Sequence, residues 1–151
     1  MAYGEARAHI ARPAGDIIEF ILDLRQYQKV DAKLGKIHWV KRDGNVVTFK
    51  FRPALLGLPG PATKQKVVLS DDRSRIDIGS AEPAFTDKIA AFAAFFLFEE
   101  ADGGTWVTRR VTFTFPPALA WLLDRPFGKW LAKDVPDELA KAKAFLESRS
   151  G

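Results

Sequence analysis

Three turn signals, each set between two segments of alternating apolar and polar residues, constrain this chain more than any other feature. The turns are Asp43-Gly44, the polar run 71–74 and Asp102-Gly103. An Asp-Gly dipeptide between two such segments is a strong hairpin signal. The pattern therefore predicts three antiparallel hairpins that have one face to bury. Their strands are expected at 36–41 and 46–51, 64–70 and 75–78, and 91–100 and 105–115.

The rest of the chain supplies one more strand and three helices. Residues 4–10 alternate like a strand that ends at Arg12-Pro13, and two short helices are expected next, one opening at 13–16 and one around 26–30. Residues 118–147 have the composition of a long helix. The order predicts an α+β fold in which a seven-stranded antiparallel sheet is covered by the long C-terminal helix, in a single domain over residues 1–151.

The long helix carries two apolar faces that differ in phase. Its first half presents Leu119, Leu122, Leu123 and Trp130, and its second half presents a face rotated by roughly a third of a turn at 3.6 residues per turn. Pro126 and Pro136 lie near the change of phase, and each removes a hydrogen bond of the helix interior. We therefore expect kinks or a break in the helix rather than one straight rod.

The Asp102-Gly103 turn sets a register for the last hairpin. If it is the turn, Phe96 pairs with Arg109 and Phe92 with Phe113. Side chains of a strand alternate between faces, so paired residues share one. The mainly apolar set is assigned to the concave face: Phe92, Ala94, Phe96, Phe98, Val107, Arg109, Val111 and Phe113. The opposite face holds Phe95, Leu97 and Trp106.

The same alternation assigns the inward residues of the other two hairpins. The middle hairpin is expected to present Gln65, Val67, Leu69, Ile76 and Ile78. In the first hairpin both faces carry apolar groups, and a slip of one residue reverses the assignment. There we expect Val40, Val47, Phe49, Phe51 and His38 inside, with Ile37 and Trp39 outside.

Arg109-Arg110 forces one guanidinium group toward the concave face, because neighbouring strand residues point to opposite sides. A buried guanidinium without a partner is costly. Arg109 therefore needs a protein carboxylate, backbone carbonyls, water at a cavity mouth or a ligand. The sequence leaves these alternatives open.

Composition excludes several classes of function. The chain has no cysteine and only two histidines, His9 and His38, which argues against a metal centre, and we expect no cofactor. Acidic and basic residues alternate along the chain, although the net charge is +4, so no basic stripe for nucleic acid is expected. No apolar run reaches the ~20 residues that span a bilayer. With no signal peptide visible, we expect a cytoplasmic protein.

The order of elements and several local strings resemble the SRPBCC superfamily of START-like helix-grip proteins. The strings are Ala11-Arg12-Pro13-Ala14 leading into 20–24, Gly103-Gly104-Thr105 before the last strand, and 142–147 at the end of the C-terminal helix. Tyr27 is followed by 28–31 without the Pro and Trp that the family often has there. The resemblance implies a sheet that grips the C-terminal helix around a cavity. It also implies binding of lipids, polyketides or other hydrophobic molecules, or polyketide cyclase activity.

Three hypotheses follow for function. The first is binding of a hydrophobic or amphipathic small molecule between sheet and C-terminal helix, with Arg109 as the polar anchor. The second is an aromatase/cyclase-type enzyme that uses Arg109, His38 or Tyr27. The third is an interaction module whose cavity is filled by its own side chains; the outward row of Phe95, Leu97, Trp106 and Trp39 suggests a homodimer there. The expected ligand-binding residues are Arg109, His38, Phe49, Phe51, Phe92, Phe96, Phe98, Val111, Phe113, Leu123 and Leu131.

Overall fold

The computed structural model, which describes residues 1–81 and 90–149, contains a seven-stranded antiparallel sheet and confirms the predicted fold class. The strands run in the order β1-β9-β8-β7-β6-β3-β2, so the first strand closes one edge beside the last. Their bounds are β1 Ala2–Ile10, β2 Lys36–Asp43, β3 Val46–Arg52, β6 Thr63–Leu69, β7 Arg75–Ser80, β8 Ala91–Ala101 and β9 Gly104–Thr114. A short hairpin missed by the sequence analysis, β4 (Ala54–Leu55) with β5 (Leu58–Pro59), follows β3.

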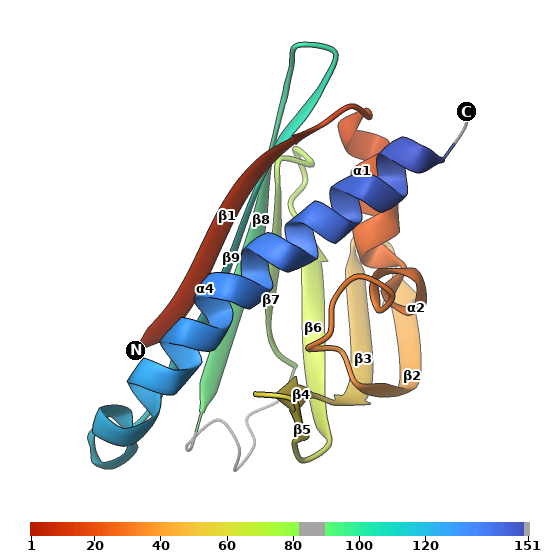
Figure 1. Cartoon of the computed structure of the whole chain (residues 1–151). Helices are drawn as coiled ribbons and strands as arrows, with labels where there is room; N and C mark the ends of the chain where they lie inside the picture. Colours follow the sequence, from red (N-terminus) through yellow and green to blue (C-terminus); the bar gives the residue numbers. More distant parts are fainter. Residues whose placement is uncertain (82–89, 150–151) are drawn as a thin grey trace.

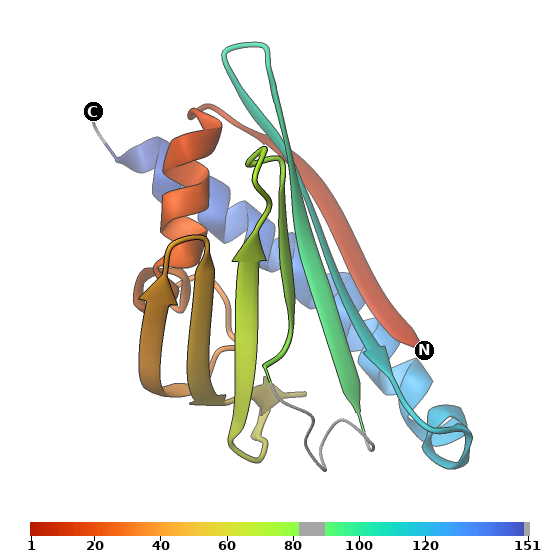
Figure 2. The ribbon, with the colours of Figure 1, turned by 180° about the vertical axis from the view of Figure 1, so that it is seen from behind.

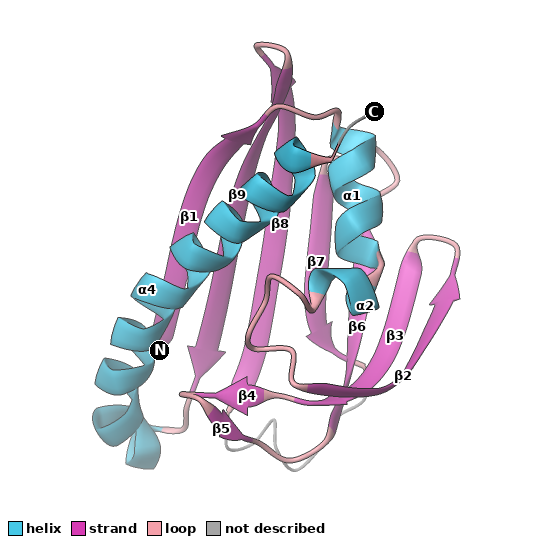
Figure 3. Cartoon of the chain, turned by 45° about the vertical axis from the view of Figure 1, so that its right-hand side comes forward, coloured by secondary structure: helices cyan, strands magenta, loops and turns pink. Residues whose placement is uncertain are grey.

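Helices cover one face of this sheet. Two short helices, α1 (Ala14–Leu22) and α2 (Leu24–Tyr27), follow β1 as expected, and α4 (Pro117–Ser148) closes the chain. Figure 1 shows α4 crossing the sheet diagonally beside β1, with α1 and α2 next to its C-terminal part. Figure 2, from behind, shows the opposite face, which none of the described helices covers. Figure 3 shows the β4–β5 hairpin at the end of the sheet away from α1.

The β8–β9 hairpin has the predicted register. Phe96 pairs with Arg109 and Phe92 with Phe113. The turn itself explains why the register holds: Asp102 and Gly103 both have positive φ, at 56° and 77°. Tight two-residue hairpin turns need this conformation, and Asp-Gly adopts it at low cost. The inward assignment of Arg109 follows directly from this register.

The first hairpin departs from the prediction because β2 contains a bulge. Its register against β3 shifts between Ile37 and Trp39, so the extra residue His38 falls out of the alternation. Ile37 is buried instead of outward, while Val40 still faces inward next to Phe49. His38 is exposed, so its predicted place inside the sheet is wrong.

Helix α4 continues without a break through Pro126 and Pro136, so of the two expected irregularities, kinks or a break, the break is wrong. Its first turns nevertheless lie at an angle to the rest (Figures 1 and 2). The helix buries one stripe instead of the two predicted faces, because Phe127 and Leu131 continue the three- and four-residue spacing of the buried residues in its second half. The apolar residues of this stripe are Phe127, Leu131, Val135, Leu139, Ala142 and Leu146. Gly4 of β1 allows α4 to pack closely on the sheet, because a side chain at this position would collide with the backbone of Leu131. Among the described residues, no helix is long and apolar enough to cross a membrane.

Candidate functional site

A cavity of about 300 Å³ lies between the sheet and the α1–α2 side of the molecule. Side chains of β3, β6, β7, β8 and β9 form its sheet wall, and α1, α2, the segment after α2 and the β4 region close it. None of the described residues that line it comes from α4. The expected position between sheet and C-terminal helix is therefore shifted toward the N-terminal helices.

The structure brings six of the eleven predicted site residues to this cavity: Arg109, Phe49, Phe51, Phe92, Phe96 and Phe113. The others do not line it. Phe98 is buried in the larger packed core, and Val111, Leu123 and Leu131 pack in the apolar cluster between α4 and the sheet edge. His38 is exposed on β2. Leu123 and Leu131 were predicted wrongly because the cavity was expected beneath α4.

Arg109 meets protein carboxylates, which is one of the alternatives that the sequence left open. The residue is 2% exposed, and its Nε donates to Glu138 Oε2 at 3.0 Å. Its Nη2 lies 3.6 Å from Asp31 Oδ2, and its guanidinium carbon lies 4.2 Å from the centre of the Phe96 ring. Its Nη1 has no hydrogen-bond partner among the described residues. Two carboxylates thus balance the charge of the guanidinium group, but its Nη1 lacks a hydrogen-bond acceptor among the described residues.

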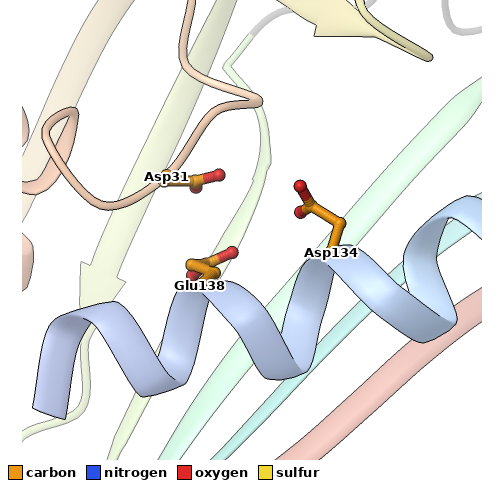
Figure 4. A group of neighbouring side chains, drawn as sticks. All are labelled: Asp31, Asp134 and Glu138. Atoms are coloured by element: carbon orange, nitrogen blue, oxygen red, sulfur yellow. The ribbon is translucent and has the colours of Figure 1, made fainter.

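Lys33 gathers three carboxylates around one ammonium group. Its Nζ lies 2.9 Å from Asp31 and 2.6 Å from Glu138, and it also contacts Asp134. Figure 4 shows these carboxylates converging from α4 and from the segment after α2. They are close enough together to hold a metal ion in geometric terms, which the sequence analysis did not foresee. The Lys33 ammonium already supplies their positive partner, so the structure gives no reason to add a metal.

Tyr27 completes the group, which we call the polar cluster: Tyr27, Asp31, Lys33, Arg109, Asp134 and Glu138. The Tyr27 hydroxyl donates to Glu138 Oε2, the oxygen that also accepts from Arg109. Tyr27, Asp31, Lys33 and Arg109 line the cavity, whereas Glu138 lies behind them. Glu138 therefore positions three cavity residues without lining the cavity itself.

Burial and charge shift the pKa values within the polar cluster in opposite directions. Burial works to raise the pKa of Glu138, but Arg109 and Lys33 outweigh it and hold that pKa below its usual value. The pKa of Asp31 is raised, first by burial and then by the nearby Glu138 carboxylate. Burial and Glu138 also raise the pKa of Tyr27 well above 10.0. Glu138 is thus the more acidic of the two carboxyl groups, and Asp31 takes up a proton more readily.

Four residues of the polar cluster were not predicted from the sequence: Asp31, Lys33, Asp134 and Glu138. A signal existed for Glu138, because it lies three residues after Val135 and four before Ala142, on the buried stripe of α4. A carboxylate on an apolar stripe needs a buried cation. Arg109, already predicted to point inward, was such a cation. No comparable signal marked Lys33, which belongs to an irregular segment.

The outward row of the sheet is less apolar than its residue types suggest. Guanidinium groups lie over two of its rings, Arg7 over Trp106 at 4.3 Å and Arg75 over Phe95 at 4.6 Å. Leu97 and Trp39 remain exposed, at 36% and 38% of their surface. The homodimer through this face stays a prediction, and sedimentation at high concentration tests it: a monomer throughout would contradict it.

Solved structures with the same fold cover nearly all of this chain. A Thermus thermophilus protein matches with a TM-score of 0.77 and 17% identity over 97% of this chain and 99% of its own. The Zhui aromatase/cyclase from Streptomyces sp. R1128 matches with a TM-score of 0.69 and 13% identity over 99% and 98% of the two chains. Norcoclaurine synthase from Thalictrum flavum matches with a TM-score of 0.66 and 11% identity over 98% and 94%. A search of curated proteins found no match.

The sheet, the long closing helix and the cavity beside them define a helix-grip protein, in agreement with these structural matches. The family model described as polyketide cyclase / dehydrase and lipid transport matches residues 1–147, so the chain belongs to this family within the SRPBCC superfamily.

Proposed function

We propose that this protein binds a hydrophobic or amphipathic small molecule in its internal cavity. The observation that carries the proposal is the cavity itself, because large buried rings can either fill a core or line a space. Here Phe49, Phe51, Phe92 and Phe113 line a space of about 300 Å³ that also borders the polar cluster. A wall of this kind favours a ligand with a large apolar body and a small polar part. The same space speaks against an interaction module with a filled cavity.

Native mass spectrometry of the purified full chain, compared with a denatured sample, tests this proposal. We expect a small apolar molecule that accompanies the folded protein and is lost on denaturation. An apo mass, together with no thermal shift against a panel of lipids and polyketide-like compounds, would contradict it.

A second candidate is an enzyme that closes rings in a polyketide-like substrate. The observation that favours it is the presence at the cavity of groups that can move protons, namely the Tyr27 hydroxyl and the Asp31 carboxyl. Arg109 beside them offers a donor to an oxygen that gains negative charge.

Turnover of a poly-β-ketone thioester tests this candidate. Ring closure that is lost in Tyr27→Phe, with ligand binding retained, would support enzymatic function. Equal product formation with and without the protein would leave binding as the function of the cavity.

A further inference from the structure

We propose that the cavity selects an uncharged ligand with a hydrogen-bonding oxygen or amide over an anionic ligand, and that Gln65 is a specificity-determining contact. This inference rests on the proposed binding function and names the chemical class of the ligand. An arginine and a lysine in the wall of an apolar cavity would by themselves indicate a site for a carboxylate such as that of a fatty acid, but the groups around them favour a neutral ligand.

The charge balance of the polar cluster argues against an anion. Its two cations, Lys33 and Arg109, face three carboxylates, from Asp31, Asp134 and Glu138. All of these groups are buried or nearly so. A further carboxylate from a ligand would add negative charge where the carboxylates already outnumber the cations, in a setting that screens charge poorly. A neutral acceptor brings no such penalty.

The unused hydrogen-bonding capacity at the cavity is suited to a neutral ligand. Arg109 Nη1 is buried without an acceptor among the described residues. Buried donors are rarely left unpaired in native proteins, and those that are need an explanation. A carbonyl oxygen that reaches this nitrogen would satisfy it without adding a charge.

Gln65 is a second polar side chain of the cavity wall. It is 9% exposed, it lines the cavity, and its amide has no hydrogen bond to the residues that the structure describes. Its neighbours across the ladder are Phe49 on β3 and Ser80 on β7. A primary amide offers two donors and an acceptor but no charge. It therefore pairs best with an amide, a ketone or a hydroxyl group of the ligand.

Gln65 and Arg109 mark different parts of the cavity. They lie on β6 and β9, which β7 and β8 separate in the sheet. At about 4.8 Å per strand this places their backbones roughly 14 Å apart across the sheet. We expect a short ligand with one neutral polar group to pair with Gln65, whereas a longer ligand with two such groups can reach both points.

Three probes of one shape test the inference on the full chain: naphthalene, 2-naphthamide and 2-naphthoate. The amide and the carboxylate have nearly equal size and differ in charge. We expect 2-naphthamide to bind about tenfold more tightly than 2-naphthoate in a titration followed by fluorescence or calorimetry. Equal or tighter binding of 2-naphthoate would overturn the inference while leaving the binding function intact. If none of the three binds, the proposed function fails as well.

Two variants separate the charge argument from the contact argument. Asp134→Asn removes one carboxylate charge beside Lys33, so we expect it to narrow the preference for the amide severalfold, whereas the exposed control Asp137→Asn leaves it unchanged. Gln65→Leu keeps the volume and should weaken 2-naphthamide about tenfold with little effect on naphthalene. An unchanged preference in Asp134→Asn would contradict the proposal. So would a Gln65→Leu variant that binds 2-naphthamide as tightly as the parent protein or that weakens both probes equally. Thermal unfolding of each variant checks that it is folded.

Discussion

The cavity has an apolar wall and a polar wall that are built in different ways. The apolar wall consists of sheet side chains whose places follow from strand alternation: Phe49, Phe51, Val67, Ile78, Phe92 and Phe113. The polar wall is the polar cluster, whose residues come from α2, the segment after α2, β9 and α4. Each residue of the apolar wall stabilises the fold through its own burial. The residues of the polar cluster, in contrast, depend on one another for their charge and hydrogen-bond partners. Removing one of them therefore leaves the others with unmet charges or hydrogen bonds.

The largest effect is expected for Glu138→Ala. Glu138 holds Arg109, Lys33 and Tyr27 at once, so its loss leaves buried cations short of a partner. Breaking a buried ion pair from one side costs about 3–5 kcal/mol of unfolding free energy. Urea denaturation measures the cost, and Asp137→Ala, on the exposed side of the same helix, is the matched control with a change within about 0.5 kcal/mol. A loss for Glu138→Ala no larger than that of the control would show that the polar cluster is not interdependent.

A smaller loss is expected for Tyr27→Phe, about 1.5–3 kcal/mol, because one hydrogen bond to a charged group disappears while the ring stays in place. The same variant tests the pH dependence of stability.

Tyr27 and Lys33 have raised pKa values, so the folded chain keeps protons that the unfolded chain releases. The unfolding free energy should therefore fall as the pH rises above about 10. Tyr27→Phe should show a shallower fall between about pH 9 and pH 11, and an identical slope would exclude Tyr27 as a contributor.

Filling the apolar wall should cost less still. Val67→Phe extends a buried side chain into the cavity, so we expect a loss below about 1 kcal/mol. The matched control, Val107→Phe, is equally buried but lies in the packed core, where added volume costs about 1–3 kcal/mol. Ligand binding should drop in Val67→Phe and persist in the control. Equal losses of stability at the two sites would mean that the cavity is not open space.

The smallest effect is expected for Arg110→Ala. Arg110 is the chain neighbour of Arg109 but points to the outer face, where it lies 3.6 Å from Glu5 and over the Tyr3 ring. Partly exposed pairs of this kind contribute about 0.2–1 kcal/mol. Chemical denaturation of the variant should therefore show a change of at most about 1 kcal/mol. A loss comparable to that of Glu138→Ala would contradict the assignment of the two arginines to opposite faces.

Much of the fold could be predicted because it depends on local patterns. The turn at Asp102-Gly103 defined the register that turns Arg109 inward, and alternation placed Gln65 and Phe49 on the same face. The errors have different causes. The bulge at His38 is a one-residue irregularity that alternation cannot reveal. The buried stripe of α4 runs through Phe127 and Leu131 and past both prolines, and there the packing of β1 against α4 is a tertiary cause.

The amino-acid sequence by itself determined the hairpins, the strand faces, the inward Arg109 and the family resemblance, because turn chemistry and periodicity act over a few residues. Only the tertiary structure decided where the cavity lies and what meets Arg109. Lys33 and Glu138 are 105 positions apart, and their pairing depends on how α4 and the segment after α2 pack. Such a contact leaves no periodic trace in the sequence, since it arises from the requirement that buried charges find partners once the chain has folded.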